Sequence, residues 1–449
     1  MLCVTGVFRS EWGLLLALEC LTGMSSEIIN ACSPGAKTPE DVLRRALCHI
    51  MLGQKRLLLK LLASACLLGV VLFAFVEYFN RILPISPDGS YFNEKKEISP
   101  HCVVPNVVEG RMSQNADEER ITLVIHASFD RISEKIVTQV NNWKGPVSLA
   151  IVFPETDNST EYHAECLYLK ILDLRTKHDD VFDRLSVHFV FPKSQQCFFN
   201  KDDIVQSARN CSGPVGEMQM DKKISAVLAY PINAARNIAR RLSKTKYVLI
   251  ADLDHLFSED FEPKMVELAK TLLSKSPKTA LVYRIFEIED GIERMPQTKS
   301  NLSALFASKQ AFEFHHGYHA HSIPHLKEWF AAEDKDVPSV QFIRPYKNPA
   351  WEPQFVSLKT IPEHDESFFY PCRDNTVLRW EMCYAGYEFA VINDVFMFHH
   401  GLKSNAENSV VRRARAKISR RTNELIRKFE ERMKTKYKNV GAICPKPKL

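Results

Sequence analysis

The chain has 449 residues, of which 45% are hydrophobic and 25% are charged, so it can bury a large core in one big domain or in two ordinary ones. The composition is that of a globular protein. The formal net charge of +5 over this length is too mild to require a nucleic-acid partner, and we predict none.

The first predicted element is a membrane anchor. Between Leu57 and Val76 only Lys60 is charged, and the run is long enough to span a bilayer. A cleaved signal peptide would be shorter and closer to the start, and a buried helix of a soluble core is the other alternative. The flanking charges are Arg44, Arg45, Lys55 and Arg56 before the run and Glu77 after it. This bias predicts a type II topology, with residues 1–56 cytosolic and the rest of the chain lumenal.

Two segments flank the anchor at 57–76. Met51 begins a stretch, MLGQKRLLLK, that is sufficient as a short cytosolic tail. Residues 1–50 are therefore predicted to be a dispensable extension, or translation starts at Met51. Residues 77–118 are rich in proline, polar and charged residues without a sustained apolar period, which predicts a stem.

An oxidising lumen has consequences for the cysteines beyond the anchor. Most of these seven should pair, and Cys197 with Cys211 is the best candidate for one bridge. The seven are Cys102, Cys166, Cys197, Cys211, Cys372, Cys383 and Cys444. Three N-glycosylation sequons also fit a lumenal domain, at Asn158, Asn210 and Asn301.

The remaining residues, 119–449, are predicted to form one α/β domain. Short apolar runs rich in β-branched and aromatic residues indicate strands at 121–128, 147–154, 185–192, 247–254 and 279–289. Helical patterns accompany them at 132–143, 232–242 and 263–273. Strands alternating with helices predict a mainly parallel central sheet covered on both faces. In such a sheet, ligands bind beyond the carboxyl ends of the strands.

Two carboxylates stand at the end of one predicted strand. In YVLIADLD, 247–254, Asp252 and Asp254 follow five apolar residues, and the alternation of side chains along a strand predicts that both point the same way. Two such carboxylates repel each other unless a cation lies between them, and oxygen ligands suit Mg²⁺ or Mn²⁺. The pair therefore indicates a metal site, although Asp-X-Asp also serves as a loop or helix cap.

Seven segments, in this order and spacing, resemble glycosyltransferase family 49. They are YPINAARNIAR (230–240), YVLIADLDHLFSEDF (247–261), TALVYRIFEIE (279–289), RMPQTKSNL (294–302), WEPQF (351–355), HDESF (364–368) and AGYEFAVINDVFMFHHGLK (385–403). The resemblance covers residues 120–445. It implies a GT-A fold, in which an α/β sheet binds the nucleotide, and an enzyme that transfers a sugar from a UDP-sugar donor.

The resemblance also implies roles for single residues. Asp252 and Asp254 match the metal-binding Asp-X-Asp of the family, and His399 matches the histidine that completes the metal site. A bound Mn²⁺ or Mg²⁺ would bridge the two phosphates of the UDP-sugar and neutralise charge as the diphosphate leaves. Arg236 and Asn237, together with Asp252, match residues expected at the nucleotide.

Inverting chemistry, which the resemblance also implies, needs a base that takes a proton from the acceptor hydroxyl. Asp365 and Glu366 match the family element for this role, with Asp365 favoured, and the alternative is that both are surface carboxylates of a turn. Trp351 and Glu352 match a block that shapes the acceptor site, where the indole would offer an apolar face to a sugar ring.

The sugar and the acceptor are predicted by resemblance alone. Glucuronic acid is the favoured sugar and N-acetylglucosamine the alternative, and the acceptor is the non-reducing end of a glycan on a glycoprotein or glycolipid. Four cations could read a sugar carboxylate, Arg284, Arg294, Lys299 and Arg373. Family members usually carry a glycine, an aromatic residue and an asparagine where this chain has Cys372, Arg373 and Asp374. This departure keeps open a second class of function, a membrane-anchored glycan-binding protein that has the fold but is catalytically weak or inactive.

The resemblance and the anchor together predict a single-pass type II protein of the Golgi membrane, with its catalytic domain in the lumen. Homo-oligomers, or hetero-oligomers with other Golgi glycosyltransferases, are left open. The histidine-rich run at 312–325 is interpreted as part of an acceptor loop rather than as a zinc site. The C-terminal stretch 410–438 is predicted to be a helix that packs Ile418, Leu425, Ile426 and Phe429 on the domain.

Overall fold

The computed structural model describes residues 101–114, 117–153, 160–192, 199, 219–315, 320–401, 405–438 and 444–449. All of these residues belong to one unit of the chain, Glu97–Leu449. The predicted cytosolic tail, the anchor at 57–76 and most of the predicted stem lie outside the described residues. Among the helices that are described, none is both long and apolar enough to cross a membrane.

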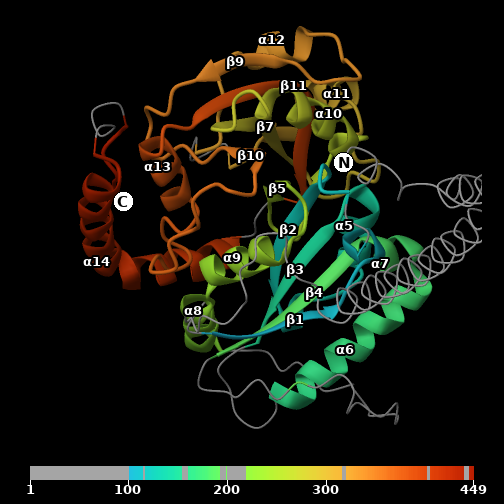
Figure 1. Ribbon diagram of the computed structural model, residues 1–449, viewed down its shortest axis with the longest axis vertical. Coiled ribbons are helices and arrows are strands. Elements are labelled where there is room, and N and C mark those ends of the chain that lie inside the picture. Colours follow the sequence, from blue (N-terminus) through green and yellow to red (C-terminus); the bar gives the residue numbers. More distant parts are fainter. Residues whose placement is uncertain are drawn as a thin grey trace, which may run out of the picture. The chain divides into compact units, whose positions relative to one another are not determined.

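The described residues form an 11-stranded mixed sheet (Figure 1). Its strand order is β1-β4-β3-β2-β5-β10-β7-β11-β6, with β8 paired to β7 and β9 paired to β11. The strands are β1 (His101–Val108), β2 (Ile121–Ser128), β3 (Val147–Val152), β4 (Leu185–Pro192), β5 (Tyr247–Ile250), β6 (His255–Phe257), β7 (Thr279–Ile288), β8 (Ala311–Glu313), β9 (Val340–Arg344), β10 (Gln354–Leu358) and β11 (Glu388–His400). The five predicted strands are confirmed as β2, β3, β4, β5 and β7.

The prediction of a mainly parallel sheet is correct for one half of the sheet and wrong for the other. Strands β4, β3, β2 and β5 run parallel to one another. Beyond them, β10 runs antiparallel to both β5 and β7, and β11 is antiparallel to β6 and β9 although parallel to β7. The reversal begins at β10, which follows a loop instead of a crossover helix, so the rule that links alternating helices to parallel strands does not apply to it.

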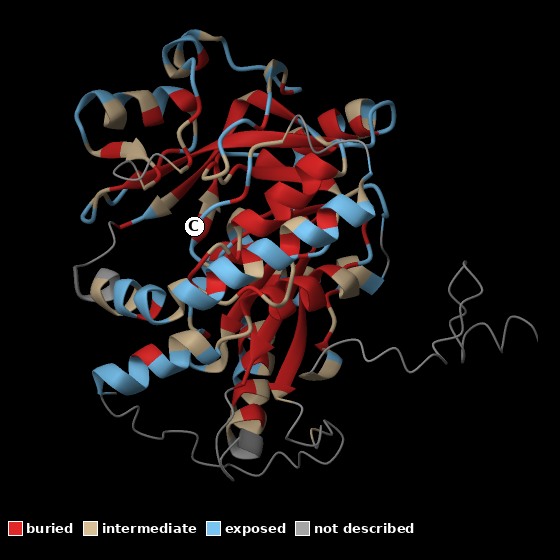
Figure 2. Cartoon of the chain, turned by 90° about the vertical axis from the view of Figure 1, so that its left-hand side faces the viewer, coloured by how far each residue is buried: buried red, intermediate tan, exposed pale blue. Residues whose placement is uncertain are grey.

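Helices cover both faces of the parallel half, as predicted. On one face, α9 (Ile232–Leu242) packs Ala235, Ile238 and Ala239 against the strands. On the other face, α5 (Lys135–Asn142), α6 (Thr160–Lys177) and α10 (Phe261–Leu273) close the larger core. Figure 2 shows most of the strands buried behind helices with exposed outer surfaces, whereas β9 and most of β1 are exposed or only partly buried. The other described helices are α4 (Arg111–Gln114), α7 (Asp179–Arg184), α8 (Met220–Ala229), α11 (Lys299–Ala307), α12 (Leu326–Ala331), α13 (Thr376–Tyr384) and α14 (Asn405–Lys436), with a 3-10 turn at Phe129–Arg131.

Strand β1 corrects the predicted boundary between stem and domain. Residues 101–108, which the sequence placed in the stem, pair antiparallel with β4. Val107 and Val108 are buried in the core of the parallel half. The pairing covers the edge of β4, whose backbone groups would otherwise be open to another chain. The folded domain therefore includes residues from His101 onward and does not begin at residue 119.

The C-terminal helices pack on the antiparallel half. Ile426 and Phe429 of α14 are buried against α13 and the sheet, with Leu425 partly buried beside them, so these three residues of the predicted apolar face are confirmed. Ile418, the fourth, is partly buried outside this cluster. A disulfide between Cys383 and Cys444 ties the chain end to α13. The predicted Cys197–Cys211 bridge lies outside the described residues, and Cys372 is a buried free thiol.

A buried ion pair joins α10 to the start of β2. Arg120 donates from Nε and from one terminal nitrogen to the Glu262 carboxylate, at 2.9 and 2.7 Å. The backbone N–H of Ile121 donates to the same carboxylate at 3.1 Å. The Glu262 side chain has no exposed surface, whereas the Arg120 side chain is 27% exposed. Loss of the carboxylate would therefore leave the buried N–H of Ile121 without an acceptor, and it would leave the half-buried Arg120 guanidinium with the carbonyl oxygen of Lys144 but without a counter-charge.

We expect Glu262→Ala to lower the free energy of unfolding by about 3 kcal/mol, because the remaining partner of a buried pair keeps its desolvation cost. Urea unfolding followed by tryptophan fluorescence measures this change. Glu267→Ala is the matched control on the same helix, since the Glu267 side chain is 59% exposed, and it should change stability by less than about 0.5 kcal/mol. Equal stability of the two variants would contradict the expectation.

Candidate active site

The pairing of β6 with β11 brings distant residues together. β5 ends at Ile250, and the chain turns through the two aspartates into β6. In the antiparallel register, His399 of β11 lies opposite His255 of β6. Nε2 of His399 consequently lies 3.0 Å from a carboxylate oxygen of Asp254. Both aspartates follow β5 and lie outside it, so the alternation of side chains along the strand does not set their directions.

The contact between His399 and Asp254 requires a positive charge, either on the imidazole ring or between the two side chains. Nδ1–H of His399 donates to the carbonyl oxygen of Gly401 at 2.7 Å, which leaves Nε2 as an acceptor in the neutral ring. The facing carboxylate of Asp254 is also only an acceptor. Either a second proton on the ring or a cation between the two groups resolves this, and a carboxylate with an oriented imidazole fits a divalent ion such as Mn²⁺.

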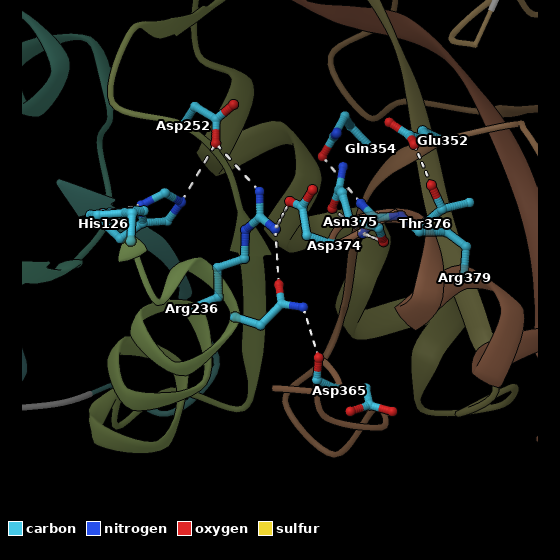
Figure 3. Close-up of polar contacts among 12 residues, drawn as sticks. His126, Arg236, Asp252, Glu352, Gln354, Asp365, Asp374, Asn375, Thr376 and Arg379 are labelled. Atoms are coloured by element: carbon cyan, nitrogen blue, oxygen red, sulfur yellow. Dashed lines mark hydrogen bonds and ion pairs between the residues drawn. The ribbon is translucent and has the colours of Figure 1, made fainter. Parts of the chain in front are cut away.

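Asp252, the third predicted ligand, faces basic groups. Its Oδ1 lies 3.7 Å from Nε2 of His126 and 3.8 Å from a terminal nitrogen of Arg236, as Figure 3 shows, and its Oδ2 lies 3.8 Å from Nε2 of His255. The surrounding protein disfavours the charged carboxylate, but the contact with His126 and the charges of His255 and Arg236 hold the pKa of Asp252 well below its usual range. In the described part of the chain, no group of three or more His, Cys, Asp and Glu side chains is placed to hold a metal. The described residues thus do not show the predicted three-residue metal site, and Asp252 faces Arg236 and the imidazoles of His126 and His255.

Arg236 links Asp252 to a second carboxylate. The guanidinium is buried, and one terminal nitrogen donates to Asp374 at 3.0 Å and to the Asn233 side chain at 3.1 Å (Figure 3). Burial raises the pKa of Asp374, an effect that Arg236 opposes. The role of Arg236 at the nucleotide stays a prediction, and its charge is already shared between two carboxylates of this chain.

Asn237 does not have the predicted role at the nucleotide. It is fully buried, and its amide donates to the carbonyl oxygen of His364 at 2.8 Å and to the Glu366 carboxylate at 3.0 Å. Its amide oxygen accepts from the His364 backbone N–H at 3.0 Å. Asn233, one turn earlier on α9, donates to the carbonyl oxygen of Asp365 at 2.9 Å. Both asparagines thus fix the HDESF segment to α9, and their polar groups are used within the fold.

The two predicted bases lie on this fixed segment. Oδ1 of Asp365 accepts from the backbone and the hydroxyl of Ser367, at 3.0 and 2.6 Å. Oδ2 of Asp365 is paired with Arg432 of α14. Glu366 accepts from Asn237 and lies 3.6 Å from Arg241. Both carboxylates are therefore oriented by neighbours, and the structure gives neither a clear advantage as the base.

The predicted acceptor residues Trp351 and Glu352 are placed differently from expectation. Trp351 is only 1% exposed, packs against Phe389 and lies under the guanidinium of Arg344 at 4.1 Å, so it offers no face to a sugar. This prediction is wrong, because an aromatic ring in a loop segment can serve the core as well as a ligand. The Glu352 carboxylate accepts from the Thr376 hydroxyl at the start of α13 (Figure 3).

His126 and Tyr230 are site residues that sequence reasoning missed. Nδ1 of His126 lies 2.8 Å from the Tyr230 hydroxyl, while Nε2 faces Asp252. His126 stands near the carboxyl end of β2, the parallel neighbour of β5. A polar residue near the end of the predicted strand ITLVIHAS was the available signal, because parallel strands end at the same edge of a sheet.

Other predicted positions are only partly described. Asn301 is exposed in the first turn of α11, as a glycan acceptor must be, whereas Asn158 and Asn210 lie outside the described residues. In the histidine-rich run, Nδ1 of His321 lies 2.9 Å from the carbonyl oxygen of Glu352, and the ring of His315 stacks on Phe314 with centroids 4.0 Å apart. The first contact is a hydrogen bond and the second is ring packing, and the role of the run as part of an acceptor loop stays a prediction.

This chain is similar to a known protein family and to several known proteins. The family described as "Glycosyl-transferase for dystroglycan" matches residues 120–438. Beta-1,4-glucuronyltransferase 1 of Mus musculus is 24% identical over 352 residues, which are 75% of this chain and 81% of that protein. The xylosyl- and glucuronyltransferase LARGE2 of Mus musculus is 24% identical over 282 residues, 62% of this chain and 34% of that protein. The structure of GalNAc-T7 with UDP, GalNAc and Mn²⁺ has a TM-score of 0.32 at 11% identity, covering 64% of this chain and 44% of that one.

The family match spans well over half of the chain, and both relatives are named as sugar-transferring enzymes, in agreement with the predicted hexosyltransferase. The chain therefore belongs to glycosyltransferase family 49 and is a glycosyltransferase with a mixed α/β fold.

Proposed function

We propose that this protein is a metal-dependent, inverting glycosyltransferase of GT-A type. It moves a hexosyl unit from a UDP-sugar to the non-reducing end of a glycan on a glycoprotein or glycolipid. The observation that carries the proposal is the contact between two acceptor groups, Asp254 and His399, at the carboxyl end of β5. The names of the relatives favour glucuronic acid as the sugar, and N-acetylglucosamine is the second candidate.

Different residues of this chain would bind the metal ion and the nucleotide of the donor. Asp254 and His399 would hold Mn²⁺, or Mg²⁺, which when bound neutralises the charge of the leaving diphosphate. Asp252 is kept ionised by Arg236 and His126 and can accept hydrogen bonds from the hydroxyls of the nucleotide. Arg236, buried and fixed by Asn233 and Asp374, holds Asp252 in place.

The acceptor side rests on the HDESF segment. Asp365, or Glu366 beside it, would take the proton of the acceptor hydroxyl while that oxygen attacks the anomeric carbon from the face opposite the leaving UDP. Asn233 and Asn237 hold the backbone of this segment against α9. The base is thereby kept at a fixed position relative to Arg236 of the same helix, which holds Asp252 in place.

The same proposal includes the location of the enzyme. Residues 57–76 would anchor it as a type II protein of the Golgi membrane, with the domain in the lumen. The Cys383–Cys444 disulfide and the exposed sequon at Asn301 support a lumenal domain.

UDP release by the purified full-length chain, measured with Mn²⁺ and a panel of UDP-sugars, tests the proposed activity. We expect release above that of the Asp252→Ala variant with at least one donor, and loss of release when the metal is chelated. No release above the variant with any donor would favour a glycan-binding protein that keeps the fold without turnover.

A further inference from the structure

Three nitrogen-bearing side chains surround the Asp252 carboxylate. Nε2 of His126 and a terminal nitrogen of Arg236 lie 3.7 and 3.8 Å from its Oδ1, and Figure 3 shows these two side chains converging on the same oxygen. Nε2 of His255 lies 3.8 Å from Oδ2. The Asp252 side chain is nevertheless 52% exposed. The carboxylate is therefore oriented by its neighbours and still accessible from solvent.

The contact between His126 and Tyr230 decides which nitrogen of the His126 ring carries a proton. Nδ1 lies 2.8 Å from the Tyr230 hydroxyl. The His126 side chain is only 9% exposed, and burial disfavours a charged ring, so one nitrogen donates and the other accepts. A proton on Nδ1 would leave a lone pair on Nε2 facing Asp252, which is also an acceptor. The arrangement without this repulsion has the Tyr230 hydroxyl donating to Nδ1, with Nε2–H directed at Asp252.

The other imidazole reaches the same state by a different route. The backbone N–H of Asp252 donates to Nδ1 of His255 at 3.2 Å, so the proton of the neutral His255 ring is on Nε2, which faces Oδ2. This hydrogen bond forms within one turn of the chain. His126 depends instead on a hydroxyl group that lies 104 residues away in the sequence. The direction of Oδ1 therefore depends on one side-chain hydroxyl, which a single substitution removes.

Tyr230 lies in a segment that contacts Asp252 in two ways. The residue stands between α8 and α9, and Arg236 lies on α9. The ring of Tyr230 packs against that of His126, with centroids 5.7 Å apart. In the described part of the chain, the buried Nε2 of His126 has no hydrogen-bond partner of its own. Asp252 is thus the group on which the orientation of this ring acts.

We propose that Tyr230 is a positioning residue for donor binding. Its hydroxyl fixes the Nε2–H tautomer of His126, and this ring holds Oδ1 of Asp252 in the direction in which it accepts from the nucleotide hydroxyls. The inference rests on the proposed function, because it concerns the carboxylate that binds the nucleotide there. Tyr230→Phe keeps the ring and loses only the hydroxyl. The proton of His126 can then move to Nδ1, which turns a lone pair towards Asp252.

Steady-state kinetics of the purified full-length chain test this proposal, with UDP release measured in Mn²⁺ over a series of UDP-sugar concentrations. Tyr230→Phe should raise KM for the donor about tenfold and change kcat by less than about twofold, because the lost interaction acts on binding. A purely structural defect would lower the folded fraction, and with it kcat, without changing KM. Tyr437→Phe is the matched control, because the Tyr437 hydroxyl donates to Glu381 at 3.1 Å, and it should leave both constants unchanged.

A double-mutant cycle shows whether Tyr230 acts through His126. His126→Leu should raise KM at least as much as Tyr230→Phe does. Adding Tyr230→Phe to His126→Leu should change KM no further, since the ring through which the hydroxyl acts is then absent. Effects that multiply in the double variant would show that Tyr230 acts independently of His126, and would overturn the proposal.

Nitrogen-15 spectra of the wild-type chain labelled at histidine test the tautomer directly, and they do not require Tyr230→Phe to fold. The His126 signal is identified by its absence from the spectrum of His126→Leu. We expect the proton on Nε2, and a proton on Nδ1 overturns the proposal. An unchanged KM in Tyr230→Phe also removes the role of Tyr230, but leaves the proposed function intact. Failure of the wild-type chain to release UDP above the Asp252→Ala variant with any donor would remove the proposed function itself.

Discussion

Replacing Asp254 with asparagine is expected to lower sugar transfer by about 10²- to 10³-fold, because the variant loses a charge that acts on the leaving diphosphate. The Asp254 carboxylate lies 3.0 Å from Nε2 of His399, and both groups are acceptors when the ring is neutral. An asparagine can donate a hydrogen bond to Nε2 of His399, so the contact between the two side chains is kept. Two acceptor groups then no longer face each other, and the pair no longer favours a bound cation. The variant should therefore fold normally and lose its response to Mn²⁺.

Two measurements check this expectation. Transfer is followed as UDP release over a Mn²⁺ titration, and calorimetry measures Mn²⁺-dependent binding of UDP to the same samples. Asp173→Asn serves as the control, since its carboxylate is 54% exposed. If Asp254→Asn binds UDP and Mn²⁺ as the wild-type chain does, the pair of Asp254 and His399 does not hold the metal, and the contact is a simple imidazolium ion pair.

The parts of this site that were predictable are those encoded locally. Consecutive apolar residues predict strand β5. The two carboxylates that follow it are visible in the same short segment, without knowledge of any residue distant in sequence. His399 is different, because it lies 145 residues from Asp254 in the sequence. The register between β6 and β11 brings the two together, and no local pattern in either strand fixes that register. Only the family resemblance indicated that His399 belongs to the same site as Asp254.

Errors arose where a residue type fits two environments. Asn237 and Trp351 both lie in segments that match the family, but a buried asparagine can hold a loop as well as a nucleotide. The side chain of Asn237 is used by His364 and Glu366, and the ring of Trp351 is enclosed in the core. The sequence shows that such a residue lies in a segment that matches the family. It does not show whether the side chain faces a ligand or the interior of the fold.

Strands without a helical crossover were the least visible part of the fold. β10 has five residues and β1 has a proline within it, so neither gives a long alternating pattern. Their direction follows from the strands they pair with, which are distant in sequence. This is why the sheet was expected to be mainly parallel and the domain was expected to start too late.

Asp365→Asn is expected to reduce the rate of transfer by about 10²- to 10⁴-fold while leaving the binding of UDP and Mn²⁺ unchanged, if Asp365 is the base. The substitution should not disturb the loop. Asn233 contacts the backbone carbonyl of Asp365 and not its side chain, and Ser367 can still donate to an asparagine oxygen. Arg432, whose side chain is half exposed, can return to water at a cost of about 1 kcal/mol or less.

The ion pair with Arg432 provides the control that separates chemistry from structure. Arg432→Gln removes the same pair but keeps the carboxylate, so a loss that came only from the broken pair would appear in both variants. We expect Arg432→Gln to retain most of its activity and Asp365→Asn to lose it, with initial rates of UDP release at saturating donor as the measurement.

Glu366→Gln tests whether Glu366, and not Asp365, is the base. Its side chain accepts from Asn237, and a glutamine can accept in the same way, so the fold is kept while the base is removed. Normal turnover in Asp365→Asn together with a collapse in Glu366→Gln would transfer the role of base to Glu366, whereas collapse in Asp365→Asn alone assigns it to Asp365.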